Sequence, residues 1–116
     1  MIKGIGIDII ELSRVQEIIT RQKKFIDRIL TDKEKQTFEE LSDLRKVEFL
    51  GGRFAAKEAF SKANGTGIGK QLSFLDIEIE TDSFGKPFIS NPKVRAHVSI
   101  SHSKEYAVAQ VVIEEN

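Results

Sequence analysis

Four residues in the second half of the chain could carry out chemistry together, because a helix would bring them to one face. They stand at positions i, i+3, i+4 and i+7 and are Glu58, Ser61, Lys62 and Gly65. A carboxylate, a hydroxyl and an ammonium group beside a glycine turn would suit a magnesium–phosphate site. Mg²⁺ prefers hard oxygen ligands, and a lysine neutralises phosphoryl charge. Asp8, in a strand-like segment, could supply a second carboxylate.

The same spacing has a plainer interpretation. Glu58 and Lys62 are four residues apart, and such pairs commonly form surface ion pairs worth a few tenths of a kcal/mol. On spacing alone this interpretation is the simpler one. His102 leaves a similar choice open. It ends a strand-like segment beside the hydroxyl of Ser103, so it could donate to a phosphate, or it could be a solvated histidine in a turn.

A second pattern alternates basic and apolar residues along a predicted helix. Its members stand at i, i+4, i+7, i+11 and i+14 and are Arg14, Ile18, Arg21, Phe25 and Arg28. Such a face would suit docking against an acidic amphipathic helix. Alternatively, the two apolar residues belong to the core and the arginines border it. The pattern alone leaves both interpretations open.

Composition restricts the class of protein. The 116 residues, 40% of them hydrophobic, predict one globular domain over residues 1–116. Eighteen basic and 18 acidic residues give no net charge, which argues against a general nucleic-acid binder. The absence of cysteine excludes thiol catalysis and cysteine-bound zinc, and it agrees with a cytoplasmic location. The apolar runs at 1–10 and 106–113 are shorter than the roughly 20 residues of a membrane span, so we expect no membrane partner.

The first half of the chain predicts a strand followed by helices. In the strand Met1–Ile10, alternation separates a glycine-bearing face that includes Asp8 from an isoleucine face. The isoleucine face is typical of a core, and the glycines leave room for a close approach. One helix is predicted from Leu12 to about Leu30, and a short one from a capping box at Thr31 to about Leu41.

A longer helix is predicted from about Leu44 to Ala63, ended by Asn64–Gly65. The pair Gly51–Gly52 inside it indicates a kink or a tight contact. The period then changes to two. Strands are predicted at 75–79, 88–89, 96–102 and 106–113, with a turn at 84–87 and a last antiparallel pair joined by 103–105. The whole indicates an α+β fold, with an antiparallel sheet packed against helices and one long central helix.

These segments together resemble the bacterial holo-acyl-carrier-protein synthase family, the small 4′-phosphopantetheinyl transferases. The resemblance covers essentially the whole chain. The segments that carry it are Gly4–Ile9, Arg28–Thr31, Phe49–Leu50, Gly52–Ala63, Gly65–Gly69, Gly85–Pro87 and His97–His102. Each is only moderately specific, but their order is specific to the family. The resemblance therefore favours a functional Glu58–Lys62 face over a routine ion pair.

The resemblance implies an enzyme that moves the phosphopantetheine group of coenzyme A onto a serine of apo acyl carrier protein, releasing adenosine 3′,5′-bisphosphate. Positions matching Asp8 and Glu58 would hold Mg²⁺, and Lys62 would neutralise the phosphate. Glu58 or a metal-bound water would be the base. The remaining coenzyme A contacts implied are Arg53, Ser61, Gly65, His102, Ser103 and the turn Gly85, Lys86 and Pro87 near the adenine.

The resemblance also implies partners. Members of the family are homotrimers with active sites between protomers, and the basic stripe together with Arg45 would receive the carrier protein. Two other functions fit the residues alone. One is a magnesium-dependent phosphohydrolase of a nucleotide, which would leave the basic stripe without a role. The other is a non-catalytic adaptor that binds an acidic helix through that stripe.

Overall fold

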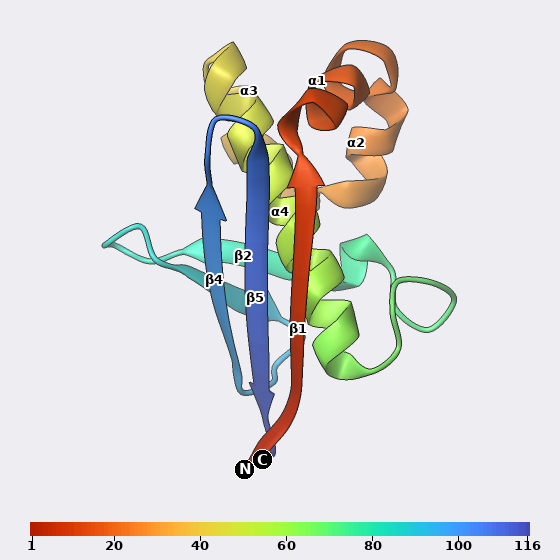
Figure 1. Ribbon diagram of the computed structural model, residues 1–116, viewed down its shortest axis with the longest axis vertical. Coiled ribbons are helices and arrows are strands. Elements are labelled where there is room, and N and C mark those ends of the chain that lie inside the picture. Colours follow the sequence, from red (N-terminus) through yellow and green to blue (C-terminus); the bar gives the residue numbers. More distant parts are fainter.

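The computed structural model describes all 116 residues as an α+β fold, as the sequence predicts (Figure 1). The elements follow in the order β1 (Ile2–Glu11), α1 (Leu12–Arg21), α2 (Lys23–Ile29), α3 (Asp32–Glu39), α4 (Asp43–Asn64), a 3₁₀ turn (Phe74–Asp76), β2 (Glu78–Thr81), β3 (Pro87–Asn91), β4 (Ala96–His102) and β5 (Tyr106–Glu114). The strands form two antiparallel sheets, one of order β1-β5-β4 and one of β2 and β3. None of the helices is long and apolar enough to cross a membrane.

The long helix α4 is the centre of the fold, and its ends are set by local chemistry. The Ser42 hydroxyl accepts a hydrogen bond from the backbone N–H of Arg45, and Gly65 ends the helix in the left-handed conformation at φ 87°. One side of the three-stranded sheet lies across α4 (Figure 1). The predicted tight contact at the glycine pair is confirmed, because both glycines are buried, and α4 continues through them without interruption.

Strand β1 lies unusually close to α4, because two of its glycines face the helix backbone. A Cβ atom at Gly6 would lie 1.9 Å from the carbonyl oxygen of Ala59, and one at Gly4 would lie 1.9 Å from that of Ala63. No side chain fits at either position. The close approach predicted for the glycine face is therefore made by α4.

The isoleucine face of β1 is not part of the core, and that prediction is wrong. Ile5, Ile7 and Ile9 are 57%, 58% and 62% exposed. The glycine face packs on α4, so alternation along the strand turns the isoleucines to the outer side of the sheet. Their direct partners on β5 are Val112, Gln110 and Val108. We keep the name isoleucine face for this exposed side of β1, formed by Ile5, Ile7 and Ile9.

The predicted helix from Leu12 to Leu30 is two helices. The backbone leaves helical geometry at Gln22, with φ −131° and ψ 54°. One straight helix over these residues would be about 28 Å long. The break instead lets α2 turn back to pack on α1 and brings Ile26 and Ile29 into the core. The capping box at Thr31 is confirmed. The strand expected from residue 75 begins later, because Phe74–Asp76 forms a 3₁₀ turn.

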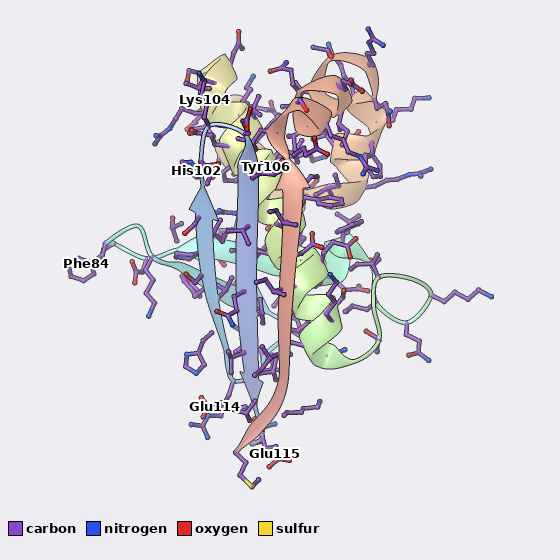
Figure 2. The ribbon with its side chains drawn as sticks, in the orientation of Figure 1. Phe84, His102, Lys104, Tyr106, Glu114 and Glu115 are labelled. Carbon is purple, nitrogen blue, oxygen red and sulfur yellow. The ribbon has the colours of Figure 1, made fainter.

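The β2–β3 hairpin projects sideways beyond β4 (Figure 1). Its tip is fixed by Asp82, whose carboxylate accepts hydrogen bonds from the backbone N–H groups of Phe84 and Lys86 at 2.8 and 2.9 Å. Gly85 supplies the positive φ of 81° that this turn requires. Figure 2 shows Phe84 pointing into solvent from the tip, and it is 94% exposed. The turn predicted at 84–87 is confirmed.

Candidate active site

Two carboxylates and a lysine come together where β1 crosses α4. Asp8, Glu58 and Lys62 line a pocket of about 510 Å³, which we call the acidic pocket. Asp8 follows Gly6 on the face of β1 that lies against α4, and Glu58 and Lys62 lie one turn apart on the helix. The Lys62 ammonium donates to the Asp8 carboxylate at 3.1 Å and to the carbonyl oxygen of Ile7 at 3.0 Å. The fold thus joins residues more than 50 positions apart.

Electrostatics in this pocket favour binding of a cation. Burial raises the pKa of Glu58, the negative charge of Asp8 raises it further, and Lys62 acts in the opposite direction. Two neighbouring carboxylates that repel each other are stabilised when a cation binds between them. A cation bound in the pocket would relieve the repulsion between Asp8 and Glu58.

The donor set fits Mg²⁺. The structure holds no group of three or more histidine, aspartate or glutamate side chains that could enclose a metal. Mg²⁺ keeps several of its waters and commonly binds through one or two carboxylates together with substrate phosphates. Asp8 and Glu58 supply the two carboxylates, with Lys62 beside them for a phosphate. Such a site would be completed by the substrate.

A second group of predicted residues lines a separate pocket of about 350 Å³, which we call the basic pocket. Its lining includes Arg45, Arg53, Gly85, Pro87 and His102, so β4, α4 and the hairpin tip all contribute. This arrangement brings the hairpin turn and the strand-end histidine beside two arginines, although they are far apart in sequence. Glu48 lines the same pocket and lies 3.4 Å from His102, so the two arginines are what favours an anionic ligand.

Arg53 is the most constrained residue of the basic pocket. Its guanidinium lies 4.3 Å from the centroid of the Phe49 ring, which holds it in place from one side. Its Nε atom is buried without a hydrogen-bond partner, and a buried donor left unpaired is costly. Burial lowers the pKa of Arg53, and the nearby Glu34 opposes this effect. An anion in the pocket would offset the charge of this guanidinium.

The two pockets open on different sides of α4. Arg53 and Glu58 are five residues apart on one continuous helix, which places them about 140° apart around its axis. No residue lines both pockets. A single chain therefore presents the acidic and the basic pocket as separate surfaces.

The other coenzyme A contacts implied by the resemblance fall in different places. Ser61 does not share the exposed face of Glu58 and Lys62, because it is fully buried and its hydroxyl donates to the Glu58 carbonyl oxygen at 2.7 Å. Gly65 ends the helix and is exposed. Lys86 is exposed at the hairpin tip. Ser103 lies outside both pockets, in the β4–β5 turn, where its hydroxyl accepts from the backbone N–H of Tyr106.

The basic stripe is divided between two helices. Arg14 and Arg21 lie on α1, whereas Phe25 and Arg28 lie on α2 beyond the break. Ile18 is a core residue at 6% exposure, so for this position the alternative interpretation of the pattern holds. Phe25 is half-buried, and the three arginines are exposed. Arg14 also lines the acidic pocket, so the stripe begins at the candidate site.

Sequence reasoning missed one pair of charged residues beside the site. Lys57 precedes Glu58 and is 0% exposed, and it contacts Glu34 of α3 at 2.6 Å. The two residues are 23 positions apart. A lysine at the centre of an alanine-rich helix segment was the available signal, because buried lysines require a partner.

Comparisons with known proteins identify the family of the chain. The sequence pattern of the ACPS family, described as the 4′-phosphopantetheinyl transferase superfamily, matches residues 4–111. A holo-(acyl-carrier-protein) synthase from Anoxybacillus flavithermus is 64% identical over 116 residues, covering 98% of this chain and 97% of the relative. One from Bacillus subtilis is 62% identical over 117 residues, with coverages of 98% and 97%.

Solved structures of similar proteins share the fold. A holo-(acyl-carrier-protein) synthase from Bacillus anthracis, in complex with CoA (3′,5′-ADP), superposes with a TM-score of 0.94 at 56% identity, covering 100% of this chain and 99% of that one. One from Helicobacter pylori, in complex with coenzyme A, gives 0.84 at 37% identity, covering 95% and 99%. With its sequence matched from residue 4 to 111, the chain belongs to the 4′-phosphopantetheinyl transferase superfamily.

Proposed function

We propose that the protein transfers the 4′-phosphopantetheine group of coenzyme A to a serine of apo acyl carrier protein. The observation that carries this proposal is the acidic pocket, in which two carboxylates and a lysine suit a pyrophosphate substrate. Relatives named holo-(acyl-carrier-protein) synthase match nearly the whole chain, and one of them is in complex with CoA (3′,5′-ADP). Both facts support the assignment. A phosphohydrolase, with water as the acceptor, would explain the acidic pocket but not the basic stripe. A non-catalytic adaptor would explain the basic stripe but not the acidic pocket.

The reaction is a phosphoryl transfer. The serine hydroxyl oxygen attacks the phosphorus that bears the pantetheine arm, the pyrophosphate P–O bond breaks, and adenosine 3′,5′-bisphosphate leaves. Catalysis of such a step depends on position and on neutralising negative charge. Lys62 would pair with the phosphate oxygens, or protonate the leaving oxygen. Glu58, whose pKa is raised by burial, is the residue of this chain placed to accept the serine proton.

We assign Asp8 and Glu58 as the ligands of Mg²⁺ in this reaction. When bound, the ion would neutralise the pyrophosphate charge. The ion pair of Asp8 with Lys62, at 3.1 Å, holds that carboxylate toward the pocket. The basic pocket would take the nucleotide end of coenzyme A. Arg53 would pair with its phosphates, whereas Arg45, which the resemblance implies as a carrier-protein contact, also lines the same pocket.

The exposed arginines of α1 and α2 would bind the carrier protein. They lie in a stretch with five basic and two acidic residues between positions 14 and 28, in a chain with no net charge. An acidic helix would be drawn to this surface by long-range attraction. Arg14 belongs both to the stripe and to the acidic pocket, so a carrier bound there would have its serine near Glu58.

We further propose that the active protein is a homotrimer with active sites between protomers. The number three follows from the family resemblance. Two features of this chain support shared sites: the acidic and basic pockets lie on different sides of α4, and the isoleucine face leaves large apolar side chains exposed. Contiguous apolar surface of this kind favours association. A neighbouring copy would bring its basic pocket to this chain's acidic pocket.

A mass measurement tests the reaction. Purified protein is mixed with apo acyl carrier protein, coenzyme A and Mg²⁺, and the intact mass of the carrier is then recorded. We expect the gain of one phosphopantetheine group, and loss of that gain when EDTA is added. A carrier whose mass does not change would contradict the proposal, and release of nucleotide without transfer would identify a hydrolase.

Complementation between inactive variants tests the shared sites. Glu58→Gln spoils the acidic pocket and Arg53→Met the basic one, so neither variant alone should turn over. In mixed oligomers from co-expression, about a quarter of the subunit interfaces pair the intact acidic pocket of one variant with the intact basic pocket of the other. Activity should recover to about that fraction of wild type. Mixed oligomers without any activity would contradict a site built from two copies.

A further inference from the structure

The most deeply buried charges of the molecule lie outside both pockets. The Lys57 ammonium donates to the Glu34 carboxylate at 2.6 Å, to the carbonyl oxygen of Ile29 at 2.6 Å and to that of Phe74 at 3.0 Å. All three of its protons have an acceptor. Glu34 is 3% exposed, and its other oxygen accepts from the backbone N–H of Ile79 at 2.9 Å.

The pair and its hydrogen-bond partners join α4 to four other elements. Ile29 ends α2, Glu34 belongs to the first turn of α3, Phe74 begins the 3₁₀ turn, and Ile79 lies in β2. Lys57 itself is at the middle of α4. Few other polar contacts join the hairpin to the helices. One is the hydrogen bond of Thr31 to the Glu78 carboxylate at 2.6 Å, and another is a surface ion pair between Lys33 and Glu80.

Stability alone is a weak reason for such a pair. Removing two charges from water costs several kcal/mol per ion, and uncharged side chains of similar volume are often as stable in the same place. Directed hydrogen bonds, however, fix relative position more sharply than apolar contacts do. The pair joins α4, which carries Arg53, to β2, whose hairpin carries Gly85 and Pro87. These are the opposite walls of the basic pocket.

We propose that Glu34 and Lys57 are positioning residues for the nucleotide end of coenzyme A. They hold the β2–β3 hairpin at a fixed distance from α4 and so set the width of the basic pocket. This inference rests on the proposed function. The acidic pocket is held by different contacts, those of β1 with α4 at Gly4 and Gly6. Disturbing the pair therefore affects nucleotide binding and leaves the transfer step nearly unchanged.

The test uses a double variant, Glu34→Gln with Lys57→Met, which removes both charges together and leaves neither member of the pair buried without its partner. We expect the KM for coenzyme A and the Kd for adenosine 3′,5′-bisphosphate, measured by calorimetry, to rise about tenfold, with kcat within about twofold of wild type. Glu34→Gln alone leaves the Lys57 ammonium buried without its carboxylate and should shift both constants in the same direction by at least as much.

The matched control is Lys33→Met, because Lys33 also joins α3 to β2 but at the surface, 2.7 Å from Glu80. It should leave KM and Kd unchanged. Unchanged constants in the double variant, with or without a lower Tm, would overturn the proposal, and so would a loss confined to kcat. Failure of the proposed function is a separate result, because it would appear in the wild-type protein as an acyl carrier protein of unchanged mass.

Discussion

Replacing Gly6 by alanine should both destabilise the protein and inactivate it. The added Cβ would lie 1.9 Å from the Ala59 carbonyl oxygen and 2.8 Å from the Ala63 backbone nitrogen, whereas real Cβ contacts essentially never fall below 3.0 Å. Both obstacles are backbone atoms of α4, so no side chain can rotate away. Strand β1 must therefore move from the helix by at least about 1 Å, and Asp8, two residues on, moves with it.

The size of both effects follows from this displacement. Overpacking of this kind costs about 1–3 kcal/mol, which corresponds to a Tm lower by about 4–12 °C for a domain of this size. A misplacement of about 1 Å at a reacting group can reduce turnover about 10²-fold. The loss should appear well below the melting temperature, where the variant is still folded, because the distance of Asp8 from Glu58 and Lys62 has changed.

Two measurements check the prediction: the melting curve by circular dichroism, and the rate of phosphopantetheine transfer followed by carrier mass. Gly69→Ala is the matched control, because nothing lies within 4 Å of its added Cβ, and it should keep both the Tm and the rate. A Gly6→Ala protein with the Tm and the turnover of wild type would refute the reasoning that β1 is held against α4 by these glycines.

Three further changes have expected outcomes. Burial and Asp8 raise the folded-state pKa of Glu58 above its unfolded value, so its protonation stabilises the fold, and this stability is lost as pH rises through the folded pKa. Glu58→Gln should therefore abolish transfer yet raise the Tm, with the larger gain at higher pH, in melts from about pH 4 to 8. Gly65→Ala places a side chain at φ 87° and should cost about 1 kcal/mol in urea unfolding. Arg28→Glu should raise the KM for the carrier protein but not for coenzyme A, and an equal effect on both would remove Arg28 from the docking surface.

Local signals in the sequence were sufficient for most of the helices and turns. The helical pattern and the glycine stop predicted α4 to within one residue at each end, and the capping box predicted the start of α3. The break at Gln22 carries no such signal, because no glycine or proline stands there. It arises from packing, since the chain must turn back for Ile26 to reach the core. Packing against residues that are distant in the sequence cannot be predicted from a local pattern.

The candidate site depended on contacts that no local pattern encodes. Helical spacing placed Glu58 and Lys62 together, but Asp8 reaches them only because β1 crosses α4 at two glycines. Spacing also placed Ser61 on the same face, whereas its hydroxyl turns inward to a helix carbonyl oxygen, as serines within helices commonly do. The pairing of Lys57 with Glu34 joins separate helices and could not be read from either segment.

The error about the isoleucine face and the separation of the two pockets have one explanation under the proposed assembly. Ile5, Ile7 and Ile9 form the pattern of a buried strand face, yet the core of the single chain lies on the other side of β1. Burial by a second copy would make the pattern correct for the assembly although it is wrong for the chain. The same contact would let the basic pocket of one copy face the acidic pocket of its neighbour. Within one copy the two pockets lie on different sides of α4 and cannot face each other. Introducing a charge by Ile7→Glu should therefore dissociate the oligomer and abolish transfer together, whereas Ser83→Glu, at the exposed hairpin tip, should do neither.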